Sequence, residues 1–279
     1  LRMYFRSLTA YVFGAFLLAF VGLGAMLYNI QAAVSNFEFV LSFSSLGFVV
    51  IVPILTMRVI AEEKKQKTDQ LLYSLPITTT QVVLGKYLAL LVMYLIPMAV
   101  ICVYPLIFAQ FGDVYLLTAY GSLFAFYLMG AALIAIGVFI SSLTDNQGFA
   151  AGIGIAVILL NYYSVSLSEY VSSTAFGSVV ALLVLALILG SVIHHLTGNE
   201  NFAFGVCILS MAVIFVSYML NSSMFEGLLP SIMEKLSLFD RFSSFVNGVF
   251  DMTSVVYDLT VIVFFLFLSV QSLEKRRYN

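Results

Sequence analysis

The sequence predicts an all-α, polytopic bundle of membrane-spanning helices, and three observations carry that prediction. Of its 279 residues, 62% are apolar and 9% are charged, whereas soluble domains average about 45–50% apolar and about 25% charged residues. Twelve Lys and Arg and fourteen Asp and Glu are too few to cover a soluble fold of this length with charge. The apolar residues also gather in runs of the length, about 20 residues, that crosses a bilayer as a helix.

Eight apolar runs are candidates for spans, and no soluble domain of useful size fits between them. The runs are 11–30, 40–60, 83–108, 116–142, 148–166, 175–194, 202–220 and 255–272. Residues 1–279 are therefore expected to form a single transmembrane domain. A count of six spans results instead if 175–220 is a re-entrant or interfacial hairpin.

The basic residues indicate which side each end of a span occupies. With eight spans, ten of the twelve fall on one face: Arg2, Arg6, Arg58, Lys64, Lys65, Lys67, Lys86, Lys275, Arg276 and Arg277. Cytoplasmic loops of membrane proteins carry an excess of Lys and Arg. We therefore expect both termini and the connection 61–82 to be cytoplasmic.

The most polar stretch of the chain is 62–70, and it is followed by apolar residues ahead of Pro76. This pattern predicts a short amphipathic helix on the cytoplasmic face. Glu62 and Gln66 are four residues apart and can pair across one helical turn, as can Lys65 and Asp69. The segment is either a solvated loop or a docking surface for a cytosolic partner.

The next helix carries a start signal. Thr78 and Gln81 have the spacing of a capping box, in which each side chain bonds the other residue's backbone N–H. The pattern predicts that two helices meet at an elbow marked by Pro76.

The same region carries a family resemblance. Glu62-Glu63-Lys64, Thr68, Leu71-Leu72, Leu75-Pro76 and Gly85-Lys86 before an apolar run resemble the permease subunits of type-2 ATP-binding-cassette exporters. In that family this connection forms a coupling helix against the ATPase subunit. The resemblance implies that contact with the ATPase involves Glu62, Glu63, Thr68, Leu71, Leu72, Leu75, Pro76 and Lys86. Lys67 stands where the family usually has glycine.

Two further stretches are similar to the same family. Residues 139–147 resemble its second cytoplasmic turn, with Thr144, Asp145 and Asn146 at the turn itself. The tail from Phe239 to Arg277 is similar to the branch of gliding-motility-associated permeases. The resemblance implies a single permease domain in a bacterial cytoplasmic (inner) membrane. It also implies a second permease, identical or different, and two ATPase subunits, which together export a substrate or extract it from the inner leaflet.

Several absences narrow the expected chemistry. The chain has no G-x-x-x-x-G-K-[ST] phosphate loop, so ATP and Mg²⁺ are expected in the partner ATPase, and this chain is expected to have no cofactor and no catalytic residues. His194-His195 are adjacent on a helix and point in different directions, so we expect no metal site. No nucleic-acid partner is expected.

The spans are nearly free of ionisable residues, with Asp258 near the mouth of the last one, which disfavours the alternative of an ion-driven carrier or channel. No clustered acid, base or metal constellation suggests an intramembrane enzyme.

Two segments predict packing rather than chemistry. Gly148 and Gly152 form a small-xxx-small pair that permits close approach of a neighbouring helix, with Ala150 and Gly154 beside it, within one subunit or between two. In 221–254, apolar residues recur at steps of three and four, which indicates one or two amphipathic helices on the extracytoplasmic surface. That segment is either a cap on the bundle or a gate or platform for an accessory membrane protein with an extracytoplasmic domain.

Overall fold

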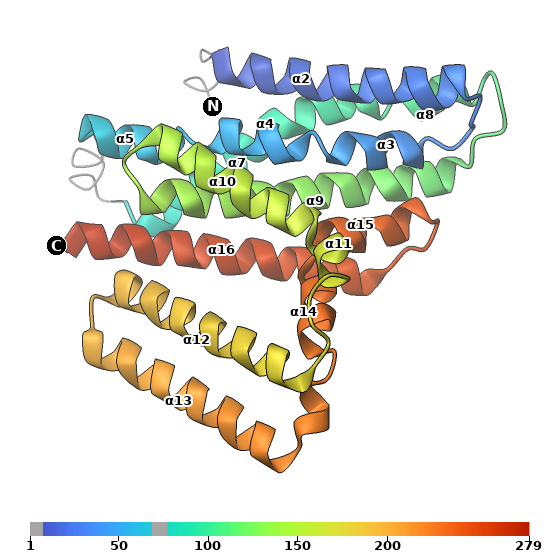
Figure 1. Cartoon of the computed structure of the whole chain (residues 1–279). Coiled ribbons are helices and arrows are strands. Elements are labelled where there is room, and N and C mark those ends of the chain that lie inside the picture. The colour runs from blue at the N-terminus through green and yellow to red at the C-terminus, as the bar shows by residue number, and fades with distance from the viewer. Residues whose placement is uncertain (1–7, 69–76, 279) are drawn as a thin grey trace. The chain divides into compact units, whose positions relative to one another are not determined.

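The computed structural model describes residues 8–68 and 77–278, without the side chains of 8, 195–197, 277 and 278, and every regular element in this part of the chain is helical. The all-α prediction is therefore confirmed (Figure 1). The chain clusters into two compact units. Unit 1 is Leu1–Tyr162 with Leu238–Arg277, and unit 2 is Tyr163–Ser237 with Tyr278–Asn279.

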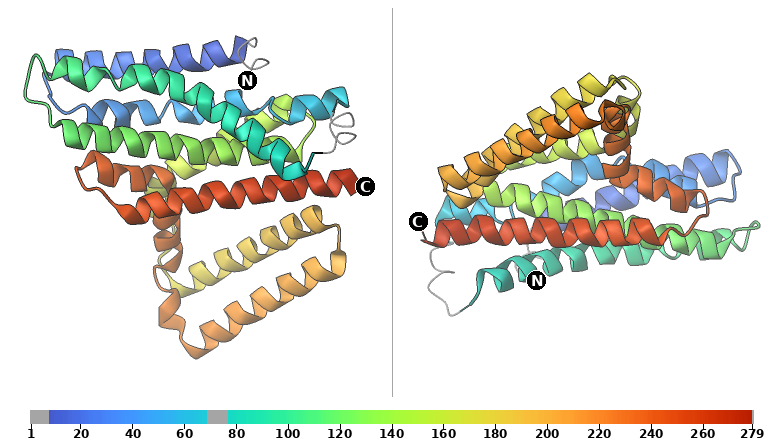
Figure 2. Two further views of the ribbon diagram at one scale, coloured as in Figure 1. Left: turned by 180° about the vertical axis from the view of Figure 1, so that it is seen from behind. Right: turned by 90° about the horizontal axis from the view of Figure 1, so that it is seen from below.

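Unit 1 contains most of the helices. They are α2 (Leu8–Gly24), the π-helical turn η1 (Ala25–Gln31), α3 (Glu38–Ser45), α4 (Phe48–Thr56), α5 (Ala61–Gln66), α7 (Thr79–Ile101), α8 (Tyr104–Phe108), α9 (Leu116–Leu143), α10 (Gln147–Tyr162), α15 (Leu238–Val246) and α16 (Met252–Tyr278). Helix α7 packs against both α2 and α9 (Figure 2).

Helix α9 is the core of unit 1. It contacts α3, α4, α7, α10 and α15, and 89% of its most apolar window is buried, against 39% or less for the other candidate spans. Its hydrophobic residues are spread around the whole circumference, which is typical of a helix surrounded by others. Burial on all sides makes α9 the element against which the others are positioned.

Glycines in α9 let its neighbours approach closely. A Cβ added at Gly137 would lie 2.2 Å from Thr56 Oγ1 and 2.8 Å from Thr56 Cβ, so α4 touches the α9 backbone there. About two turns earlier, Gly130 receives the ring of Tyr94 from α7, whose hydroxyl donates to Phe126 O at 2.9 Å. In lipid, helices gain no hydrophobic driving force for association, and small residues such as these let their backbones pack closely instead.

Helix α10 packs on α4 through a small-residue stripe, but the stripe is rotated from Gly148 and Gly152. Its buried residues are Ala150, Gly154 and Ile158, and a Cβ at Gly154 would lie 3.0 Å from Pro53 Cβ. Gly148 and Gly152 are exposed on this chain, and nothing lies within 4 Å of a Cβ placed at Gly152. The seam within the subunit is therefore made by the neighbouring set of small residues.

Unit 2 is an excursion between α10 and α15. It contains α11 (Ser164–Ser168), the hairpin α12 (Ala175–Thr197) and α13 (Glu200–Leu220), the 3₁₀ turn η2 (Ser222–Phe225) and α14 (Leu228–Leu236). Inside it, α11 is joined to α14 by hydrogen bonds from Ser164 Oγ to Met233 O, at 2.5 Å, and from Ser168 Oγ to Glu234 Oε1, at 3.1 Å.

The excursion leaves unit 1 and returns to it at neighbouring points. Asn161 Oδ1 accepts a hydrogen bond from Leu238 N at 3.0 Å, and the rings of Tyr162 and Phe239 pack edge to face with centroids 5.0 Å apart. These contacts fix α10 and α15 together at the base of the excursion.

The helices refine the span count. Among the described residues, six helices are long and apolar enough to cross a membrane: Thr9–Gln31, Thr79–Phe108, Leu116–Leu143, Ala175–His194, Glu200–Leu220 and Met252–Arg276. The pair Glu38–Ser45 and Phe48–Gln66, bent by 59°, counts as a seventh if it is one span, while Gln147–Tyr162 is shorter. Both helices of 175–220 are long and apolar enough to span, whereas the run 40–60 forms a bent pair of helices and the run 148–166 a shorter helix.

The amphipathic segment 221–254 forms two main helices, α14 and α15. Helix α15 buries Leu238, Phe239, Phe242 and Phe245 and contacts α9, α3 and α10 within unit 1. This part of the segment is packed on the bundle, as the cap interpretation expects.

Gly137→Ala should destabilise the protein, because the new methyl meets Thr56 Cβ at 2.8 Å rather than a flexible side-chain end. Overpacking of this kind costs about 1–3 kcal/mol. Unfolding by sodium dodecyl sulfate in mixed micelles measures the loss. Gly152→Ala is the matched control, with open space around its Cβ; equal stabilities for the two variants would contradict the close α4–α9 contact.

Candidate coupling interface

A break in the second span is closed by a side chain from α9. The chain leaves helical geometry between α4 and α5, and Ile60 N and Ala61 N donate to Ser141 Oγ at 3.2 and 3.1 Å. Ser141 Oγ in turn donates to Met57 O at 3.3 Å. Because Ser141 is fully buried, it acts as the N-cap of α5 from a neighbouring helix, satisfying N–H groups that α5 cannot pair itself.

Lys64 on α5 is a buried cation with a backbone partner. Its side chain is 6% exposed, and its ammonium donates to Ser142 O on α9. The same carbonyl accepts from Ser272 Oγ of α16 at 3.0 Å. Three helices, α5, α9 and α16, therefore meet at one carbonyl, and Lys64 is held there rather than on the surface.

Lys86 connects α5 to α7. Its ammonium forms an ion pair with the Glu63 carboxylate and donates to Val59 O at 2.6 Å. Both side chains are largely shielded from solvent, so this pair is less screened than an exposed one. Two of the residues singled out by the sequence, Glu63 and Lys86, are thus brought together.

The second turn, between α9 and α10, lies at the same end of α9. Asn146 Oδ1 accepts from Gly148 N at 2.9 Å and Phe149 N at 3.3 Å, which caps α10. Asp145 is paired with Arg276 of α16 at 2.8 Å. Thr144 Oγ1 accepts from Asn146 N at 3.1 Å. The turn is therefore ordered by its own side chains and tied to α16.

The remaining coupling residues divide between described and undescribed parts of the chain. Glu62 accepts from Gln66 Nε2 at 3.3 Å, which confirms that pair. Thr68 bonds back to Glu63 O through both its backbone N–H and its hydroxyl. Of the residues named for this segment, Asp69, Leu71, Leu72, Leu75 and Pro76 lie outside the described residues.

Lys67 ends α5 in the left-handed conformation, with φ +56° and ψ +22°. Its N–H bonds Glu63 O and Lys64 O, and Thr68 N bonds Glu63 O, which is the hydrogen-bonding pattern of a helix C-cap. Glycine adopts this conformation without steric cost, so the local geometry fits the glycine that the resembling family carries here. The Thr78–Gln81 capping box at the start of α7 is also confirmed.

Several residues of this cluster were not among the coupling or turn residues expected from the sequence. They are Lys64, Ser141, Ser142, Ser272 and Arg276, and all contact residues at least 78 positions away in the chain. The available signal was the Ser141-Ser142 pair at the end of the apolar run 116–142, since polar residues in a span usually face protein. Spacing along the chain could not identify their partners.

A family model described as ABC-2 family transporter protein matches residues 25–175. This chain belongs to that family. No curated protein and no solved structure matches it. The match covers α5, Lys86 and the second turn, and leaves out the α16 residues that bond to them. As a member of the ABC-2 family, the chain is a permease component of an ABC transporter.

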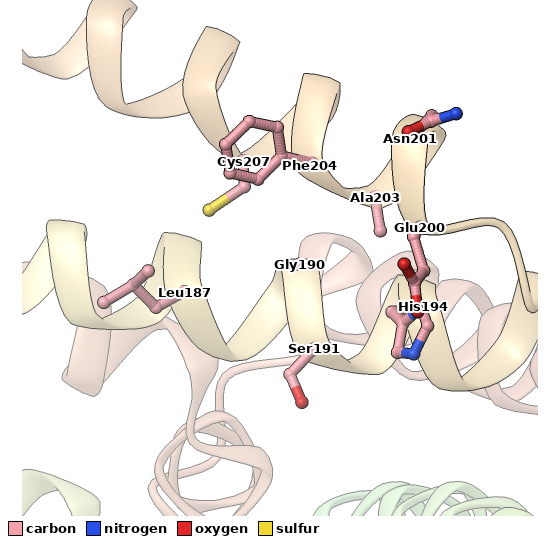
Figure 3. Close-up of a pocket in the computed structure, with 9 residues that line it drawn as sticks. All are labelled: Leu187, Gly190, Ser191, His194, Glu200, Asn201, Ala203, Phe204 and Cys207. Atoms are coloured by element: carbon pink, nitrogen blue, oxygen red, sulfur yellow. The ribbon is translucent and has the colours of Figure 1, made fainter.

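A recess with a volume of about 440 Å³ lies within the α12–α13 hairpin of this ABC-2 permease. Its lining includes His194, Glu200 and Cys207 (Figure 3), which places a carboxylate and a thiol in the same recess as His194, as the sequence did not indicate. Cys207 packs on the opposing helix, with its Sγ 3.3 Å from a Cβ at Gly190. In the described part of the chain no three His, Cys, Asp or Glu side chains are grouped to hold a metal ion.

Two carboxyls of unit 1 are buried away from the coupling cluster. Glu38 is 1% exposed and Asp258 is 6% exposed, and one oxygen of each lacks a hydrogen-bond partner. Asp258 is thus enclosed rather than open at the mouth of its span. Next to it on α16, the ring of Tyr257 carries the Arg241 guanidinium at 4.0 Å from its centroid.

Ser141→Ala should destabilise the protein by about 1–3 kcal/mol, because two buried N–H groups lose their acceptor. Ser142→Ala is a control of identical chemistry and burial, since Ser142 Oγ bonds only Phe139 O in its own helix, at 2.7 Å. The two variants are compared by unfolding in mixed micelles. If they were equally stable, Ser141 would not be the cap of α5.

Lys67→Gly should stabilise the protein, because it relieves a left-handed conformation that costs a non-glycine residue about 1–2 kcal/mol. Thermal unfolding in detergent measures the gain. Lys65→Gly removes the same charge from an exposed position within α5 and should destabilise by about 1 kcal/mol. Loss of stability in both variants would argue against the cap geometry at Lys67.

Proposed function

We propose that this ABC-2 permease exports a substrate, or extracts it from the inner leaflet, using ATP hydrolysed by separate ATPase subunits that dock on residues 61–82. The observation that carries the proposal is the polar cluster at the end of α5. Buried Lys64, the Glu63–Lys86 pair and the Ser141 cap join α5 to α7 and α9. A push on the coupling segment would therefore move these helices together instead of bending a loop.

The second turn supports the same mechanism. Asp145 and Asn146 lie at the same end of α9 as the α5 contacts, and Arg276 links the turn to α16. An ATPase that pressed on both segments would move α16 as well as α4 and α7. Glu62, Thr68, Thr144, Asp145 and Asn146 are then the described residues nearest to such a partner, while Lys64 and Ser141 transmit from within.

The setting of this mechanism follows from charge. The ten basic residues on one face favour a cytoplasmic coupling segment and cytoplasmic termini, in a bacterial inner membrane. The assembly would contain a second permease, identical or different, as well as the ATPase subunits with their ATP and Mg²⁺. The similarity of the tail to gliding-motility permeases stays part of this proposal, as does an accessory protein bound at 221–254.

Replacing Leu72 and Leu75 together with Asp should abolish ATPase recruitment. An apolar edge buried in a partner groove contributes far more to affinity than solvated charges do, so binding and vanadate-sensitive hydrolysis in lipid should fall by about tenfold or more. The measurements are co-purification with a candidate ATPase subunit and the hydrolysis rate of the purified complex.

The control places the same two Asp residues at Phe111 and Tyr115, two exposed residues in the connection between α8 and α9, outside the candidate spans. This control protein should insert into the membrane and recruit the ATPase normally. If the Leu72 and Leu75 variant bound its ATPase and turned over like the control, residues 61–82 would be a solvated connection and the mechanism would lose its central contact.

A further inference from the structure

An apolar groove of about 560 Å³ opens in unit 1 at the end of α9 remote from the coupling cluster. One wall is the first two turns of α9, from Leu117 to Phe124, and the other is the end of α15 with the turn that follows it, from Phe245 to Phe250. This size lies within the range of about 300–1,000 Å³ that is typical of small-ligand sites.

A glycine turn builds the groove. Gly248 has φ +80° and ends α15, with Gly248 N bonding Phe245 O and Val249 N bonding Ser244 O, both at 3.0 Å. The turn carries Phe250 toward α9, where its ring stacks on Phe124 with centroids 6.3 Å apart. The same ring packs edge to face on Phe245 of α15 at 5.3 Å. Gly121 on α9 leaves space below it, since a Cβ there would lie 3.8 Å from the Phe250 ring.

The lining offers an occupant almost no hydrogen bonds. It contains no charged residue, and two of its three hydroxyls already donate to backbone carbonyls: Ser122 Oγ to Phe245 O at 2.9 Å and Tyr120 to Cys102 O at 3.0 Å. A peptide backbone laid here would lose hydration without gaining partners, which is costly. A hydrocarbon chain has nothing to satisfy.

The groove lies near one end of a candidate span, on the first two turns of α9. The apolar side chains at its rim are open, with Leu117 90% and Val249 59% exposed. The end of a span meets the membrane–water interface, where tyrosines such as Tyr120 are enriched.

Asp251 adds a negative charge beside the groove. Its carboxylate accepts from Ser254 Oγ at 2.6 Å and from Thr253 N at 2.9 Å. These hydrogen bonds, that of the Ser254 hydroxyl first, lower the pKa of Asp251, so it is ionised at neutral pH. A headgroup that carries an ammonium is compatible with this neighbour.

We propose that the groove between α9 and the α15–α16 turn binds one acyl chain of a bilayer phospholipid. The site is independent of ATPase docking. It differs from the ordinary lipid-facing surface because the chain is held between two walls that the Ser122–Phe245 hydrogen bond joins. The lipid would fill the space between α9 and α15 that side chains leave open.

The absence of tryptophan from the sequence allows a clean test. Val249→Trp places a single fluorophore in the groove, and Leu88→Trp places one on an exposed face of α7, where Leu88 is 57% exposed. Each delipidated protein is titrated in detergent with phosphatidylethanolamine carrying brominated acyl chains. Quenching at 249 should saturate and be reversed by unbrominated lipid, whereas quenching at 88 should rise without saturation.

Groove-filling variants make the test specific. In the Val249→Trp background, Gly121→Leu should weaken half-saturation by about tenfold or more, and Gly121→Ala, which only meets Phe250 at ordinary contact distance, should not. Similar quenching at 249 and 88, or no effect of Gly121→Leu, would overturn the proposal. So would shielding of position 249 from brominated lipid in the reconstituted transporter, because a protein partner would then cover the groove.

Discussion

The coupling end of this permease depends on one hydrogen-bonding constraint. The second span breaks between α4 and α5, and in apolar surroundings the N–H groups released by a break must find acceptors. Ser141 provides one acceptor for both Ile60 and Ala61. Because that hydroxyl belongs to α9, the break fixes α5 to the core helix, and the positions of Lys64 and Glu63 follow from it.

The rest of unit 1 is arranged around the same helix. Helices in lipid gain little from burying apolar surface against each other, so close packing and hydrogen bonds must hold them. Gly137 and Gly130 provide the packing by admitting Thr56 and Tyr94 to the α9 backbone. Ser122 and Ser141 provide hydrogen bonds near the two ends of α9. The mostly apolar helix α9 thus carries serines at the few positions where other helices need a hydrogen-bond partner.

The sequence predicted the parts of the structure that depend on local pattern. Runs of apolar residues gave the helices, and the Thr78–Gln81 spacing gave the capping box. The interruption of the second span between α4 and α5 was missed because no proline or glycine lies between Met57 and Ile60. Instead, the chain is held there by a side chain 80 residues away.

The site was predictable to a similar extent. Glu63 and Lys86 could be selected by their resemblance to a family, and the structure pairs them. Lys64 looks like any solvated lysine in a charged run, and only tertiary contact shows that it is buried. Within this chain, Ala150 and Gly154 rather than Gly148 and Gly152 are the buried small residues of α10. A four-residue spacing occurs twice there, and spacing alone does not say which face meets α4.

The neck between Asn161 and Leu238 has a consequence for the lineage of this chain. Since the chain leaves and re-enters unit 1 at bonded neighbours, unit 2 resembles a module inserted into a bundle that is closed without it, and the family match ends at residue 175, where its hairpin begins. The hairpin contributes an even number of crossings. Gain or loss of such a pair preserves the parity of the chain, so the C-terminal helix would keep its orientation and its contact with the second turn while the inserted module diverged.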